Sequence, residues 1–238
     1  MFTDLPEIVA SSYGADIDRL ITVITWIVGI WFVAAEGLLL WFLFRYRQRP
    51  GQRAAWLPAD SLRMSAWVLV PAAIVLVLDL HIETASHHVW QKIKGDIPEY
   101  DMEVRIEARQ FAWTFTYPGL DGEFDTADDL KHATELHVPE GRVVRFTLES
   151  VDVLHSFWVP AFRLKQDVVP GRSIAGWFEA VTTGEFEIAC AELCGAAHGS
   201  MKGNLIVHSQ PQFDDWMRYH TEQGALLAHS MVKSGPGS

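Results

Sequence analysis

The sequence predicts a membrane-anchored β protein, in which a pair of transmembrane helices precedes one β domain. Two long apolar runs lie in the N-terminal part of the 238-residue chain, and short segments of alternating polar and apolar residues follow from about residue 101 to residue 208. Apolar runs of such length are typical of membrane spans. Short alternating segments separated by Pro, Gly and Asp turns are typical of a sandwich or barrel.

The two apolar runs read as a helical hairpin. The first extends from about residue 20 to residue 44 and is interrupted only by Glu36, so it is long enough to cross a bilayer. The second, about residues 66–82 around Pro71, is shorter. Alone it is also compatible with a buried helix of a soluble protein, but after the first run it reads as the return span. We assign residues 1–95 to this hairpin.

Charges beside the runs predict the orientation. The loop between the runs carries one acid, Asp60, and five bases: Arg45, Arg47, Arg49, Arg53 and Arg63. By the positive-inside rule this loop is cytoplasmic, both termini lie outside, and the β domain faces the periplasmic side of the cytoplasmic (inner) membrane. The alternative for the first run is a secretory signal, but the run is too long and lacks a basic segment before it.

The β domain is predicted over residues 96–210. Alternation is clear in the stretches that begin at Met102, Arg142 and Gly184. Residues 211–238 are expected to form a closing amphipathic helix, as far as about Gln223, and then a flexible tail. The formal net charge of -11 argues against a nucleic-acid partner and would suit a basic protein partner.

A short C-terminal stretch carries the candidate chemistry. The only two cysteines, Cys190 and Cys194, lie four residues apart, and His198 and Met201 follow. Thiolate and thioether are soft donors and imidazole is borderline, so the set favours copper, and two thiolates could bridge a pair of copper ions. A disulfide or a structural zinc site is the alternative, but a disulfide needs neither the imidazole nor the thioether, and zinc rarely binds a thioether.

A two-metal centre needs a further nitrogen donor, and His155 is the candidate. It lies in an apolar run that is predicted to end a strand beside the turn at Pro160. An isolated histidine in such a run is more often a hydrogen-bonded core residue. Here the cysteine loop already supplies four donors and leaves a position to fill.

Three motifs together carry a resemblance to a known family. They are His155-Ser-Phe-Trp, Lys165-Gln-Asp-Val-Val-Pro-Gly-Arg and Cys190-Ala-Glu-Leu-Cys-Gly-Ala-Ala-His-Gly-Ser-Met. The chain resembles subunit II of haem–copper cytochrome c oxidases, which implies a cupredoxin-like Greek-key β-barrel with a binuclear copper A centre. The implied ligands are His155, Cys190, Cys194, His198, Met201 and the backbone carbonyl of Glu192. The Glu192 side chain would help to bind magnesium at the contact with subunit I.

The resemblance also implies the function. The chain would be the copper-bearing subunit of a respiratory terminal oxidase, embedded in membrane lipid beside subunit I and other oxidase subunits. It would take electrons from cytochrome c or another redox protein and pass them to haem in subunit I, where oxygen is reduced to water, with no substrate chemistry in this chain alone. A nitric oxide reductase subunit with the same centre and a membrane-tethered copper carrier are the alternatives.

Two positions depart from the family pattern. Where relatives carry Gln-Trp-x-Trp, this chain reads Gln110-Phe-Ala-Trp113, so the tryptophan at which electrons enter is replaced by Phe111. Strand alternation predicts that Phe111 and Trp113 share one face and jointly form the donor's docking patch, with packing of Trp113 in the core as the alternative. The glutamate that many relatives carry before the tryptophan of the second span is absent before Trp67. No Cys-x-x-Cys-His occurs, so a covalent c-type haem is not expected.

Overall fold

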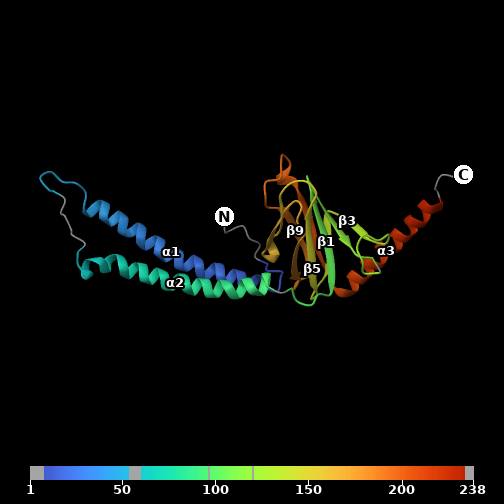
Figure 1. The fold of residues 1–238 in the computed structure, drawn as a ribbon, viewed down its shortest axis with the longest axis horizontal. Coiled ribbons are helices and arrows are strands. Elements are labelled where there is room, and N and C mark those ends of the chain that lie inside the picture. The colour runs from blue at the N-terminus through green and yellow to red at the C-terminus, as the bar shows by residue number, and fades with distance from the viewer. Residues whose placement is uncertain (1–7, 54–59, 96, 120, 234–238) are drawn as a thin grey trace. The chain divides into compact units, whose positions relative to one another are not determined.

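The computed structural model describes residues 8–53, 60–95, 97–119 and 121–233 (Figure 1). They form two compact units, residues 16–92 and the remainder. The elements in chain order are α1 (Gly14–Arg45), α2 (Leu62–Lys94), β1 (Met102–Arg109), β2 (Ala112–Tyr117), β3 (Leu130–Ala133), β4 (Glu135–Pro139), β5 (Val143–Ser150), β6 (His155–Val159), η1 (Pro160–Phe162), β7 (Leu164–Val168), β8 (Ile174–Glu179), β9 (Gly184–Cys190), η2 (His198–Ser200), β10 (Lys202–His208) and α3 (Gln210–Lys233).

The helices α1 and α2 confirm the predicted apolar hairpin. Both are long and apolar enough to cross a membrane, and none of the residues in their apolar windows is buried. Each extends beyond the predicted span, α2 by more than ten residues to Lys94. An ion pair of 2.7 Å between Lys92 and Asp16 joins the two helices at one end. Exposed apolar surface of this extent needs a bilayer or partner helices to cover it.

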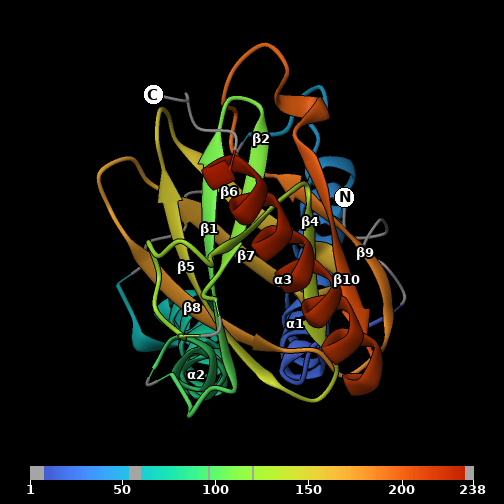
Figure 2. The ribbon, with the colours of Figure 1, turned by 90° about the vertical axis from the view of Figure 1, so that its right-hand side faces the viewer.

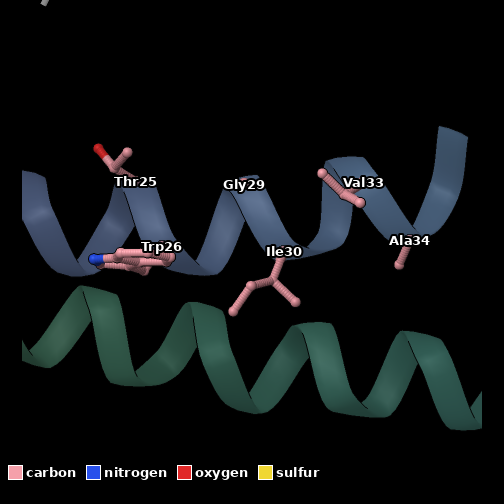
Figure 3. A pocket seen from close by; sticks show the side chains of 6 residues that line it. All are labelled: Thr25, Trp26, Gly29, Ile30, Val33 and Ala34. Carbon is pink, nitrogen blue, oxygen red and sulfur yellow. The ribbon is translucent and has the colours of Figure 1, made fainter. Parts of the chain in front are cut away.

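A groove of about 580 Å³ runs along α1 and is lined by six of its residues (Figure 3). In this view Trp26 and Ile30 lie between the two ribbons. The lining is almost entirely apolar. Such a lining suits an acyl chain or an apolar helix and would be unfavourable in contact with water.

The β domain consists of two five-stranded sheets, which confirms the predicted β architecture and is consistent with a cupredoxin-like fold (Figure 2). One sheet has the order β3-β2-β1-β5-β8 and the other has the order β4-β10-β9-β6-β7. Most neighbours are antiparallel, but β1 pairs with β5 and β4 pairs with β10 in parallel. The parallel pairs join segments that are distant in sequence. The antiparallel pairs β9–β10 and β6–β9 place β6 beside the two strands that flank the cysteine loop.

Alternate side chains from the two sheets fill the core. In β1 the buried positions are Val104, Ile106 and Ala108, and in β5 they are Val144, Phe146 and Leu148. The register places Ile106 opposite Leu148, so one apolar face of each strand points inward. Burial of a large apolar side chain contributes roughly 1.5–3 kcal/mol, which makes this face the main source of the domain's stability.

The segment before α1 packs on the β domain rather than on the helices. Ala10 accepts a hydrogen bond from Val181 and donates one to Ala161, and Ser11 forms a bridge with Ala180. Tyr13 is fully buried against Trp177. The sequence-based boundary at residue 95 therefore omits a contribution that the N-terminal segment makes to the β domain.

Helix α3 packs over β3, β4 and β10 (Figure 2). It begins at Gln210, as expected, but extends to Lys233, beyond the predicted end near Gln223. Residues 234–238 of the predicted flexible tail lie outside the described residues. Trp216 and Phe213 face the sheet from the first turns of the helix, where their rings stack on each other.

Candidate metal centre

The cysteine loop connects β9 to β10, and its two ends are held together by the pairing of these strands. Cys190 is the last residue of β9, and its N–H donates to the carbonyl of Met201, just before β10, at 3.1 Å. The register Ala189↔Lys202 continues this pairing. A loop fixed at both ends holds its donors in place with little further loss of entropy, so the strand pair determines where the sulfur atoms lie.

The predicted donors converge within the loop. The Sγ atoms of Cys190 and Cys194 are 3.8 Å apart, and Cys194 Sγ lies 3.6 Å from His198 Nδ1 and 3.8 Å from Met201 Sδ. Cys190 Sγ lies 3.2 Å from the carbonyl oxygen of Glu192. The cysteines are free rather than disulfide-bonded, since a disulfide needs sulfur atoms about 2.05 Å apart.

His155 completes the cluster from another strand. It is the first residue of β6, which pairs with β9 through Phe157 and Cys190. Its ring is fully buried, and Nδ1 lies 3.9 Å from Cys190 Sγ. Donors bound to one metal at about 2.0–2.3 Å lie roughly 3–4.6 Å apart, so these separations fit metal ligands without rearrangement. The chemistry of the set, two thiols with two imidazoles and a thioether, fits copper.

A second layer of hydrogen bonds orients the ligands. Asp152 Oδ1 lies 2.8 Å from His155 Nε2, which leaves Nδ1 directed at the sulfur atoms. The backbone N–H of Gln110 donates to Asp152 at 2.6 Å, and its side-chain amide donates to the Cys194 carbonyl at 2.5 Å. Partners of this kind fix the ring of a metal-binding histidine. Burial tends to raise the pKa of Asp152, but the bonds from His155, Gln110 and Val153 outweigh it and hold that pKa at about 2.

The Cys194 thiol is protonated when no metal is bound. Burial, followed by the adjacent Cys190, raises the pKa of Cys194 to about 11. Since the thiolate is the species that binds metal, loading of the site displaces this proton.

The structure separates the two aromatic residues that were expected to form the docking patch. Trp113 is fully buried, with its ring edge against Phe157 at a centroid distance of 5.5 Å and against His155 at 6.3 Å. The jointly exposed patch is therefore wrong, and core packing of Trp113 is correct. The physical reason is that Phe111 precedes β2 and lies in the turn after β1, so strand alternation does not relate it to Trp113.

Phe111 lies over the cysteine loop. Two of its ring carbons come within 3.0 and 3.1 Å of the position that a Cβ on Gly195 would occupy. Gly195 has a φ of 139°, so a glycine satisfies both the backbone and the close approach. Phe111 is half-buried, so one side of the ring meets the loop and the other reaches the surface.

Sequence reasoning missed an apolar rim around the ligands. Leu193, between the two cysteines, is 81% exposed, and three further exposed apolar residues precede His155, namely Val151, Val153 and Leu154. Apolar residues in a β domain are ordinarily read as core, so the pattern gave no indication of exposure. Contiguous exposed apolar surface is typical of an interaction site.

Comparison with known proteins agrees with these features. Residues 102–209 match the family model described as the periplasmic domain of cytochrome c oxidase subunit II. The alternative cytochrome c oxidase subunit 2 of Bradyrhizobium diazoefficiens is 32% identical over 246 residues, which cover 94% of this chain and 87% of the relative. This chain belongs to the cytochrome c oxidase subunit II family.

Further relatives are similar over most of the chain or over its β domain. Cytochrome c oxidase subunit 2 of Thermostichus vulcanus is 30% identical over 90% of this chain and 77% of its own length. Among solved structures, the periplasmic domain of subunit II of cytochrome oxidase from Bradyrhizobium japonicum aligns with a TM-score of 0.48 and 27% identity, over 54% of this chain and 99% of that domain. Membership of the family makes this chain a subunit of an oxidoreductase complex, a haem–copper oxidase, in which it takes part in electron transfer.

Proposed function

We propose that the six donors hold a binuclear copper A centre, which accepts electrons from an extracytoplasmic redox protein such as cytochrome c and delivers them to haem in subunit I. The observation that supports this most strongly is the pair of free thiols 3.8 Å apart with an imidazole beside each. Two thiols at this separation can bridge two metals, whereas a mononuclear site needs only one. When bound, the copper pair supplies one-electron storage that is shared between two ions.

The chain's own residues limit how far that site rearranges during electron transfer. His155 is fixed by Asp152, the loop base is closed by the Cys190–Met201 hydrogen bond, and Gln110 restrains the Cys194 carbonyl. Ligands on a rigid scaffold change position little when one electron is added or removed, and this favours fast relay. The Glu192 backbone carbonyl faces the sulfur atoms, which leaves its carboxylate for the magnesium ion proposed at the contact with subunit I.

Copper content and electron paramagnetic resonance test the proposal. The full chain in detergent, loaded with copper and freed of loosely bound metal, should contain a pair of copper ions that share one unpaired electron. The spectrum should then show hyperfine coupling to two equivalent copper nuclei, because the bridging thiolates delocalise the electron. A spectrum with coupling to a single copper nucleus in the wild-type chain would exclude the bridged centre and favour a copper carrier.

We further propose that the chain crosses the cytoplasmic membrane twice, with the arginine-rich loop inside. The support is the excess of arginine over acidic residues in the loop between the two apolar runs. A cysteine at Gln52 should resist a membrane-impermeant thiol reagent in intact cells, whereas one at the exposed Glu123 should react. The neighbouring Gly122 has a φ of 72° and is less suitable for substitution. Both positions should react after permeabilisation, and the opposite pattern in intact cells would invert the topology.

A further inference from the structure

A second group of metal-binding side chains lies at the corner between β3 and β4, apart from the cysteine loop. His132 is in β3, and Glu135 and His137 are in β4. One ligand atom from each of the three lies within 4.8 Å of the others. Glu135 Oε2 is 3.4 Å from His137 Nε2 and 3.8 Å from His132 Nδ1. A tetrahedral zinc ion, with bonds of about 2.0–2.2 Å, needs donors roughly 3.3–3.6 Å apart, so small movements are sufficient.

One donor atom is buried without a partner. His132 Nδ1 is inaccessible to solvent and has no hydrogen bond to any of the described residues. At 3.8 Å the Glu135 carboxylate is too far away to accept one. A buried polar nitrogen without a partner is unfavourable and calls for an explanation, which a metal ion between the two side chains would provide.

The corner that carries the three residues is held firmly. Thr134 connects the two sheets with a φ of 68°, its N–H donates to the Trp113 carbonyl, and its own carbonyl accepts from Asn204 at 2.8 Å. Gly203 allows this contact, because a Cβ there would lie 2.6 Å from the Thr134 oxygen. Fixed backbone on both sides keeps the donors in position, as a metal site requires.

Neighbouring rings orient His137. Its Nδ1 lies 2.8 Å from His208 Nε2, which directs its Nε2 towards Glu135. Trp216 of α3 stacks on the His137 ring at a centroid distance of 4.2 Å and 17°. A hydrogen-bond partner at the other ring nitrogen, here His208, is the usual support of a metal-binding imidazole. Burial lowers the pKa of His137 to about 4, more than Glu135 raises it, so the ring is neutral at neutral pH and offers a lone pair.

We propose that His132, Glu135 and His137 form a second metal site, which binds a divalent cation of the zinc type. Two imidazoles and one carboxylate suit such an ion, with the remaining position left to water or to a further imidazole. His220 of α3 offers that imidazole, since its ring centroid is 5.5 Å from that of His132. The site shares no residue with the cysteine loop, so it does not depend on the copper proposal.

Cobalt absorption spectroscopy on the full chain in detergent, with zinc as the competing ion, tests this proposal. In a Cys190→Ser, Cys194→Ser background, one cobalt ion per chain should give ligand-field absorption without thiolate charge transfer, and one zinc ion should displace it. Adding Glu135→Gln should weaken binding at least 10-fold, and His208→Ala should weaken it roughly 10–100-fold, as for other residues that support a ligand. Adding His81→Ala, on the exposed face of α2, should change nothing.

The wild-type chain provides a second measurement if the cysteine variant does not fold. Cobalt bound at the cysteine loop shows thiolate charge transfer, so the two sites are distinguishable in one spectrum. Glu135→Gln should then remove only the cobalt that lacks this band. Absence of such an ion, or its retention with unchanged affinity after Glu135→Gln, would overturn the proposal.

Discussion

Replacing Cys194 with serine should abolish the binuclear copper centre. The Cys194 sulfur atom lies at the centre of three other donors, with Cys190 Sγ, His198 Nδ1 and Met201 Sδ all within 3.8 Å. A serine hydroxyl is a hard, weakly acidic donor that does not bridge copper as a thiolate does. The shared-electron signal should be lost entirely, together with oxidase activity of the assembled complex. Electron paramagnetic resonance and metal analysis of the full chain measure this effect.

Met201→Leu is the matched comparison. Met201 is fully buried, and leucine keeps a similar volume, so the expected cost in stability is less than about 1.5 kcal/mol. A thioether binds copper weakly and mainly tunes its potential. We therefore expect copper to stay bound and the midpoint potential to shift. A copper-free Met201→Leu chain, alongside a Cys194→Ser chain with a normal spectrum, would reverse this order of importance.

The sequence was sufficient to pick out the candidate metal donors because most of them follow a local pattern. Four donor side chains and the Glu192 carbonyl lie within twelve residues, and only His155 comes from elsewhere. The β domain and the apolar helices were predictable for a similar reason, since both depend on short-range periodicity. Which strands become neighbours was not predictable, because the parallel pairs β1–β5 and β4–β10 depend on contacts between distant segments.

The histidine cluster shows what such periodicity does not reveal. His132, Glu135 and His137 are close in sequence and could have been noticed, but His208 and His220 join them only through β10 and α3. The wrong prediction for Trp113, by contrast, has a local origin. A turn of two residues, Gln110 and Phe111, separates β1 from β2, and a pattern that treats the stretch as one strand assigns the wrong face.

Phe111→Ala should slow reduction of the centre by its native donor while the copper spectrum stays unchanged. Phe111 is half-buried over Gly195, so its ring links the cysteine loop to the surface. Alanine removes the ring surface that a donor would contact. It also removes the side chain that would bridge the gap between a docked donor and the copper centre. A tenfold slower rate corresponds to about 1.4 kcal/mol in activation free energy, which is the size of effect we expect.

Stopped-flow reduction of the assembled oxidase, with Phe124→Ala as the control, distinguishes this role from a general loss of surface aromatics. Phe124 is also half-buried, but it lies in the acidic stretch after β2 and packs under Arg105 at 4.6 Å. Its removal should leave the rate unchanged. The net charge of -11 would favour association with a basic donor, so higher ionic strength should slow this association in the wild type. Rates that respond neither to Phe111→Ala nor to salt would place the point where electrons enter elsewhere, and would indicate a donor held permanently within the complex.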